Sequence, residues 1–185
     1  ASIMLPFIPM LPAQILLLNL LSDGPALAIA TDRVDPEEEQ SPRTWNMRSV
    51  RGFMVLFGLV SSVFDVTAFV ILRQYIHADA ELFRTGWFVL SLFTELIALL
   101  VLRTNRSTFR SRPGRILTWA SLTMVVVGLI VGLTNVGSVV TMQPLPMDAL
   151  VLVLALSTGY VFANEATKAV VRRTRYMATY MSDAR

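Results

Sequence analysis

The chain has no cysteine, a single lysine and a single histidine among its 185 residues. Without cysteine it can form neither a disulfide framework nor a thiolate metal site. The only lysine, Lys168, is followed by Ala169 and Val170, so neither a Gly-Lys-Ser/Thr phosphate loop nor an Asp-Lys-Thr-Gly phosphorylation motif is present. No serine or cysteine hydrolase triad is recognisable. We therefore expect no catalytic residues and no bound cofactor in this chain, which should hydrolyse nothing alone.

Charged residues are also scarce, at 16%, whereas hydrophobic residues make up 54% and the mean hydropathy is +0.59. A soluble domain of this length needs far more polar surface, so the composition predicts a protein embedded in a lipid bilayer. An isoelectric point of 9.8 is also typical of nucleic-acid-binding proteins, but here the basic residues lie between apolar stretches. We therefore expect no nucleic-acid partner.

Five apolar stretches are long enough to cross a bilayer. They lie at about 13–30, 52–76, 85–102, 116–140 and 147–170. None alternates with a period of two, which favours helices over a barrel. The sequence therefore predicts an all-α membrane protein, a bundle of five transmembrane helices with a short proline-rich N-terminal segment (1–12), forming a single transmembrane domain over residues 1–185.

The basic residues fall on one side of this bundle. If five helices alternate in direction, all sixteen lysines and arginines except Arg73 and Arg84 lie near the first connection, the third connection or the C-terminus. The positive-inside rule then places these segments, including the C-terminus, in the cytoplasm. The first connection, from Asp32 to Arg48, is mixed in charge and is expected to be solvated.

The first apolar stretch carries polar groups near its centre, in Asn19-Leu20-Leu21-Ser22-Asp23-Gly24-Pro25. A carboxylate at mid-membrane depth costs about 3 kcal/mol unless it is paired. On a helix, Asn19, Ser22 and Asp23 share one face and offer amide, hydroxyl and carboxylate oxygens, which suit Mg²⁺ or Ca²⁺. Gly24 and Pro25 are expected to weaken or break the helix directly afterwards. The pattern fits a cation site or, alternatively, a polar contact at a kinked helix crossing.

Two further carboxylates lie near the middle of apolar stretches, Asp65 in the second and Glu95 in the third. Aspartate and glutamate are too short to reach the membrane surface easily from there. Together with Asp23 they would repel one another unless a cation or protons separate them. The alternative for Asp65 is a protonated acid, or one bonded to a neighbouring hydroxyl such as that of Ser62.

Other polar and small residues in the stretches have simpler interpretations. Asn135, in the fourth stretch, is expected to make a polar helix contact. Glu165 precedes Lys168 by three residues near the end of the fifth, which predicts a surface ion pair. Gly128 and Gly132 form a Gly-x-x-x-Gly pattern that favours close helix packing within the bundle.

The sequence also resembles a known family. Gln14-Ile15-Leu16-Leu17-Leu18-Asn19-Leu20-Leu21-Ser22-Asp23-Gly24-Pro25 is similar to the sixth membrane helix of P-type cation-transporting ATPases. Pro144-Leu145-Pro146-Met147 looks like the loop before their tenth helix. Arg51-Gly52-Phe53-Met54 through Ser61-Ser62-Val63-Phe64-Asp65 resembles the seventh helix of the magnesium-transporting branch, and Thr85-Gly86-Trp87-Phe88-Val89 also suits that branch. The resemblance covers nearly the whole chain, as helices six to ten.

The resemblance implies that Asn19 and Asp23 are metal ligands, with Ser22 at the third motif position of the site. It places Glu95 where calcium-pumping relatives carry a glutamate ligand, and leaves Asp65 as a further candidate. The magnesium branch more often has glutamine at the Glu95 position and Tyr-Asp where this chain has Ser22-Asp23. The expected transported divalent cation is therefore Mg²⁺ first and Ca²⁺ second.

The function implied by the resemblance is that of the membrane-embedded cation-binding and scaffold half of an ATP-driven pump in a prokaryotic plasma (inner) membrane. Since the chain begins in apolar sequence without methionine, we expect a fragment of a longer polypeptide. Its missing N-terminal part would supply helices one to five and the cytoplasmic domains that bind ATP and Mg²⁺. The alternatives are a stand-alone secondary cation or proton transporter and a structural membrane subunit.

Overall fold

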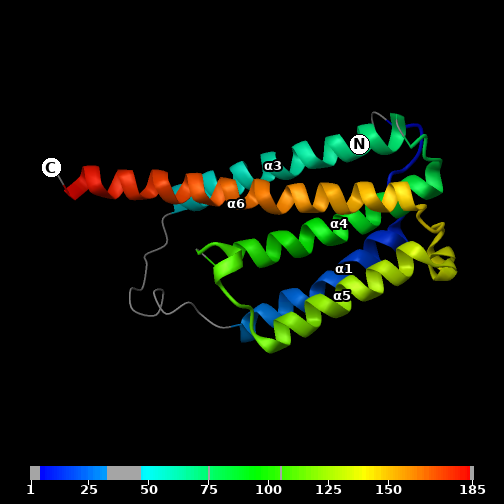
Figure 1. The fold of residues 1–185 in the computed structure, drawn as a ribbon, viewed down its shortest axis with the longest axis horizontal. Helices are drawn as coiled ribbons and strands as arrows, with labels where there is room; N and C mark the ends of the chain where they lie inside the picture. The colour runs from blue at the N-terminus through cyan, green and yellow to red at the C-terminus, as the bar shows by residue number, and fades with distance from the viewer. Residues whose placement is uncertain (1–4, 33–46, 75, 105, 184–185) are drawn as a thin grey trace.

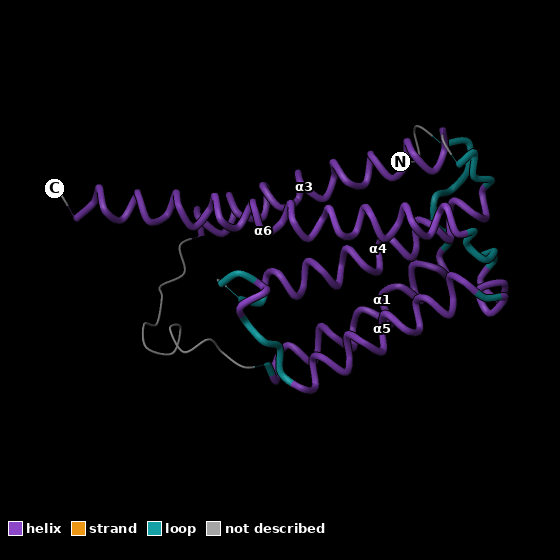
Figure 2. The backbone as a smooth tube through the Cα atoms, viewed as in Figure 1, coloured by secondary structure: helices purple, strands orange, loops and turns teal. Residues whose placement is uncertain are grey.

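The structure is a computed structural model that describes residues 5–32, 47–74, 76–104 and 106–183. Most of the first connection, predicted to be solvated, lies outside these residues. The elements are α1 (Pro12–Ala28), η1 (Ile29–Thr31), α3 (Met47–Gln74), α4 (Ala80–Leu102), η2 (Thr108–Arg110), α5 (Arg115–Leu133), η3 (Asn135–Val140) and α6 (Met147–Asp183), where η marks a 3₁₀ helix. The described residues contain no strand (Figure 2). Five of the helices are long and apolar enough to cross a membrane, which confirms the all-α prediction.

Helix α4 lies at the centre of the bundle. It packs against α1, α5 and α6 and also touches α3, while α3 pairs with α6 and α1 pairs with α5 (Figure 1). Half of the apolar window of α4 is buried, against 17–28% in the other four helices. The outer faces of those four helices remain exposed, as expected where lipid or further helices take the place of water.

The two ends of the bundle differ in charge. The end of α1 and the α4–α5 connection lie together at the left-hand end of the bundle in Figure 1, and α6 extends beyond them on the same side. We call this the arginine-rich end, because the connection there carries Arg103, Arg106, Arg110, Arg112 and Arg115. The α3–α4 and α5–α6 connections lie at the opposite end.

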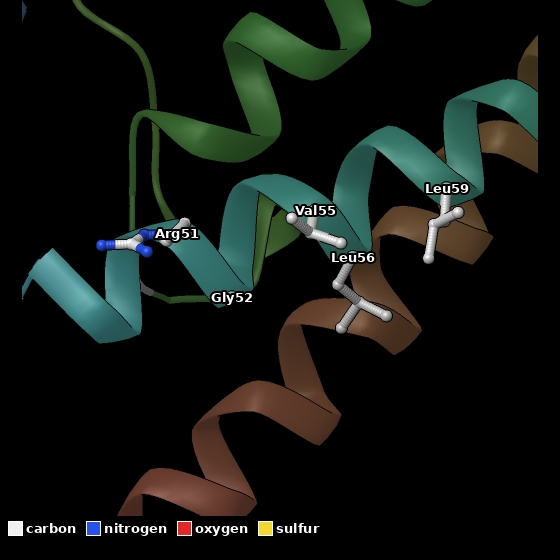
Figure 3. Close-up of a pocket in the computed structure, with 5 residues that line it drawn as sticks. All are labelled: Arg51, Gly52, Val55, Leu56 and Leu59. Carbon is white, nitrogen blue, oxygen red and sulfur yellow. The ribbon is translucent and has the colours of Figure 1, made fainter.

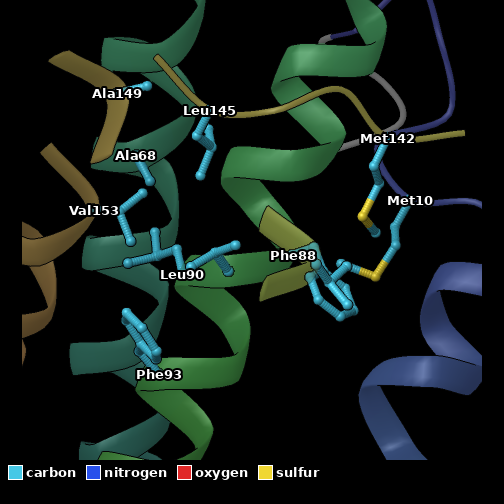
Figure 4. Packing of buried hydrophobic residues seen from close by; sticks show 11 residues of the cluster. Met10, Ala68, Phe88, Leu90, Phe93, Met142, Leu145, Ala149 and Val153 are labelled. Atoms are coloured by element: carbon cyan, nitrogen blue, oxygen red, sulfur yellow. The ribbon is translucent and has the colours of Figure 1, made fainter. Parts of the chain in front are cut away.

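The main core joins all five helices around α4. Phe88, Val89, Leu90 and Phe93 of α4 are buried in it, and Met10 points toward Phe88 from the segment before α1 (Figure 4). The other buried members are Ala68, Val131, Met142, Leu145, Ala149 and Val153. Packing against four other helices therefore fixes α4, the helix that carries Glu95.

The Gly-x-x-x-Gly pattern of α5 allows α4 to approach closely, as predicted. A Cβ added at Gly128 would lie 2.1 Å from Leu92 Cδ2, and one at Gly132 would lie 2.5 Å from Val89 Cγ2. Both distances are too short for non-bonded carbon atoms. The two glycines therefore serve a contact inside the bundle.

The structure corrects one expected helix end. Helix α1 runs unbroken through Gly24-Pro25 to Ala28, in agreement with the expected span of about 13–30, with Pro25 buried inside it. Its surroundings tolerate the proline, as neighbouring helices often do in membranes. The fourth stretch ends at Leu133 rather than near 140, because Thr134 is extended and its hydroxyl accepts a hydrogen bond from the backbone N–H of Val136. Asn135 thus lies exposed in η3 and not in a membrane-spanning helix.

Helix α4 begins at Ala80 because Asp79 caps it. The carboxylate of Asp79 accepts hydrogen bonds from the backbone N–H of Leu82 (2.8 Å) and from Nε2 of Gln143 (2.5 Å). The bond from Leu82, and then that from Gln143, lower the pKa of Asp79 below its usual value. The capped end of α4 is thereby tied to the α5–α6 connection.

Replacing Asp79 with Ala is expected to lower the free energy of unfolding by about 1 kcal/mol, because the cap is lost. The pKa is depressed in the folded state, so the carboxylate stabilises the fold above its unfolded pKa of about 4 and loses this effect as the pH falls through the folded pKa. Thermal unfolding in detergent at pH 7 and at pH 3 measures both effects. Asp79→Asn, which keeps a capping oxygen, serves as the control, and an Ala variant as stable as the original at pH 7 would disprove the cap.

Candidate cation site

The predicted ligands Asn19 and Asp23 lie on the uncovered face of α1. Leu17, Leu18 and Leu21 turn toward the core, whereas Asn19 and Asp23 are exposed on the opposite side of the helix. Their large apolar neighbours on this face are exposed as well: Leu16 by 70%, Leu20 by 68% and Leu27 by 76%. The face therefore combines an apolar surface with one amide and one carboxylate.

Such a face is costly in direct contact with lipid. An unpaired carboxylate near the middle of the membrane costs about 3 kcal/mol, and an unpaired amide adds to that cost. No hydrogen bond or ion pair of the Asp23 carboxylate occurs within the described part of the chain. Because an unpaired carboxylate is costly there, a bound cation and further helices are expected next to this face.

Ser22, the third predicted ligand of α1, is half-buried. Its hydroxyl donates a hydrogen bond to the backbone oxygen of Asn19 at 3.1 Å, which leaves the lone pairs of the hydroxyl oxygen available. Ser22 can thus act as a weak neutral ligand beside Asp23.

Glu95 is exposed on α4. Its neighbour Leu96 belongs to a buried cluster with Leu92 and Met124, against which Leu18 of α1 packs. Asn19 and Asp23 lie on the other side of α1 from Leu18, so this contact does not bring them to Glu95 within the described residues. The pairing of Asp23 with Glu95 stays a prediction.

Asp65 is half-buried on α3, a helix that packs against α6 and α4. Helix α1 lies on the other side of α4, beside α5 (Figure 1). A ligand role for Asp65 stays a prediction and has less structural support than that of Asp23.

The described residues do not form a closed metal site by themselves. Among them, no three histidine, cysteine, aspartate or glutamate side chains come close enough together to hold a metal ion. A shallow groove on α3 is lined by Arg51, Gly52, Val55, Leu56 and Leu59 (Figure 3). It contains no carboxylate, so it is not a candidate for the cation site.

Gln14 is one functional residue that reasoning from the sequence left without a role. Its side chain is fully buried, accepts a hydrogen bond from the backbone N–H of Leu11 and donates to the carbonyls of Val140 and Thr141. The start of α1 is thereby fixed to the α5–α6 connection. The sequence signal for this role is the position of Gln14 at the start of an apolar stretch, because a buried amide side chain needs hydrogen-bond partners.

Asp32 and Arg103 were also missed, because each looked like a charge in a connection. Arg103 Nη1 lies 2.7 Å from Asp32 Oδ2, and their side chains are only 2% and 8% exposed. Glu165 and Lys168 form an ion pair at 3.6 Å, as predicted, but it is not a surface pair: the side chains are 13% and 5% exposed. Glu165 also accepts hydrogen bonds from Thr108, which joins α6 to the α4–α5 connection.

Comparison with known proteins decides the family. The family model described as "Cation transporting ATPase, C-terminus" matches residues 7–170. The chain belongs to this family. It is 35% identical over 178 residues to "Magnesium-transporting ATPase, P-type 1" of Salmonella typhimurium (strain LT2), and 34% identical over 181 residues to the protein of that name in Escherichia coli (strain K12).

Each of these two alignments covers 94% of the chain and 20% of the relative. A second protein of that name in Salmonella typhimurium LT2 is 28% identical over 173 residues. The chain therefore spans about one fifth of the length of the curated relatives it matches. The resemblance read from the motifs is confirmed, together with the prediction of a multi-pass membrane protein.

Proposed function

We propose that this chain is the membrane-embedded cation-binding and scaffold portion of an ATP-driven P-type pump that moves Mg²⁺. The observation that carries the proposal is the exposed pair Asn19 and Asp23 on the uncovered face of an apolar helix, in a chain of this family. The names of the relatives favour Mg²⁺ over Ca²⁺ as the transported ion. Glu95 is the feature that keeps Ca²⁺ as the second candidate.

In this proposal Asp23 supplies the charge of the site, Asn19 and Ser22 supply neutral oxygens, and Glu95 completes the set from α4, with Asp65 as a further candidate. Mg²⁺ holds its water strongly and is usually bound by one or two carboxylates. A site with one central carboxylate and two neutral oxygens therefore suits a partly hydrated Mg²⁺. Direct coordination of the ion by Glu95 as well as by Asp23 would suit Ca²⁺, which binds with fewer retained waters.

The partners follow from the same proposal. Further helices of the same polypeptide would cover the exposed face of α1, and its cytoplasmic domains would bind ATP and undergo phosphorylation. The bundle would lie in a prokaryotic plasma membrane, with the arginine-rich end and the C-terminus in the cytoplasm. Apart from the ligands proposed on α4 and α3, helices α3 to α6 would then form the scaffold against which α1 presents its ligands.

The proposal is tested by the cation dependence of ATP hydrolysis in the full-length pump. At a fixed concentration of Mg·ATP, free Mg²⁺ is expected to activate hydrolysis and to saturate, whereas Ca²⁺ activates less. Activation by Ca²⁺ alone would replace Mg²⁺ with Ca²⁺ as the transported ion. Hydrolysis that does not respond to any free cation would contradict the proposed function.

A further inference from the structure

The buried ion pair at the arginine-rich end joins three helices at one point. Arg103 follows α4, and its Nη1 donates to Oδ2 of Asp32, which follows α1 and η1. Oδ1 of Asp32 accepts from the backbone N–H of Gly114 at 2.6 Å, where α5 begins. Arg103 Nη2 donates to the carbonyl and the hydroxyl of Ser111. The ends of α1 and α4 and the start of α5 are therefore held by one carboxylate and one guanidinium.

Gly114 permits this arrangement. A Cβ at this position would lie 3.2 Å from Asp32 Oδ1 and 3.6 Å from Asp32 Cα. The absence of a side chain thus lets Asp32 reach the N-terminus of α5, where a negative charge is also favoured by the helix dipole.

The ion pair has a fixed relation to the candidate ligands. Asp32 follows Asp23 by nine residues and Arg103 follows Glu95 by eight, and both helices run toward the arginine-rich end. Leu18 and Leu21 of α1 pack against the cluster that contains Leu92 and Leu96 of α4, so the segments that carry Asp23 and Glu95 lie at a similar depth. The ion pair lies beyond both ligands, at the ends of the same two helices.

We propose that Asp32 and Arg103 are positioning residues that fix the register between α1 and α4, and with it the spacing of Asp23 and Glu95; this rests on the proposed function. Burying an ion pair contributes little net stability, because desolvation offsets the attraction between the charges. Fixing the register of packed helices is the best-supported use of such buried polar groups. A slip of one residue would move one ligand by about 1.5 Å, most of a metal–oxygen distance.

The test measures the helix spacing and the cation response in the same full-length pump. Since this chain has no cysteine, spin labels at Ala30→Cys and Leu102→Cys, both exposed positions at the helix ends, report the distance between the ends of α1 and α4 once other cysteines of the pump are removed. The concentration of free Mg²⁺ that gives half-maximal phosphorylation from ATP is measured in pumps without labels. The variants are Asp32→Asn, Arg103→Gln and Arg103→Lys. The control is Tyr160→Phe, which removes the hydrogen bond between Tyr160 and Ser61 that joins α6 to α3, away from the α1–α4 link.

We expect Asp32→Asn and Arg103→Gln to broaden or shift the distance distribution and to raise the half-maximal Mg²⁺ concentration on the order of five-fold, with little change in maximal phosphorylation. Arg103→Lys should be intermediate, and Tyr160→Phe should change neither quantity. An unchanged distribution in Asp32→Asn, or a broadened one with an unchanged Mg²⁺ requirement, would overturn the proposal. A pump with the original sequence that ignores free cations would instead overturn the proposed function, so the two failures differ.

Discussion

Replacing Asp23 with Asn in the full-length pump is expected to abolish cation-stimulated phosphorylation. The change removes the only full negative charge that α1 contributes to the site and keeps its size. Loss of residues that merely support metal ligands already costs about 10–100-fold in affinity or activity, so loss of the central carboxylate should exceed 100-fold. The measurement is phosphoenzyme formation from ATP over a range of free Mg²⁺ concentrations.

The same variant should fold normally. Asp23 is exposed, and no contact within the described residues depends on its charge, so expression and thermal stability should match those of the original protein. Asp148→Asn is the matched control, since it removes a second exposed carboxylate from the first turn of α6, outside the site. Cation-stimulated phosphorylation that survives in Asp23→Asn would remove Asp23 from the site.

Replacing Gly128 with Leu is expected to have the largest effect on stability. The new Cβ would lie 2.1 Å from Cδ2 of Leu92, a fully buried side chain, so either Leu92 must leave its place in the core or α4 and α5 must separate. Overpacking of this kind costs about 1–3 kcal/mol, and a rigid helix contact belongs at the upper end. The measurement is the melting temperature of the purified protein in detergent.

Gly58→Leu provides the comparison, because a Cβ at Gly58 meets nothing within 4 Å. That variant should melt at nearly the original temperature. Since Leu92 lies one turn before Glu95, the Gly128 variant should also weaken the response to Mg²⁺. Equal melting temperatures for the two variants would show that the helices do not approach each other as closely as described.

The sequence was sufficient to predict the membrane-spanning helices, because a bilayer imposes a length of apolar residues that few other structures require. It also predicted the role of Gly128 and Gly132, since small residues four apart on a helix have few uses besides close packing. The end of α5 was misplaced because residues 134–140 carry no charge and include three valines, although the helix has stopped. Hydropathy detects the membrane environment, whereas a break in a helix depends on local geometry.

The polar contacts at the ends of the bundle could not be predicted from the sequence. Asp32 and Arg103 are 71 residues apart, and each alone looks like a charge that marks the membrane boundary. Gln14 and its carbonyl partners in the α5–α6 connection are separated by more than 120 residues. Only the packing of α1 against α4 and α5 brings these groups together. The candidate ligands were recognisable because a carboxylate at membrane depth is unusual wherever its partner lies.

The most direct test is a density map of the full-length pump in Mg²⁺, at a resolution that shows ions and side chains. The account predicts density for a bound ion about 2.1 Å from a carboxylate oxygen of Asp23, or one water further away, between α1 and helices that cover its exposed face. A map in which Asp23 faces bulk water or lipid, with the ion held elsewhere, would contradict it.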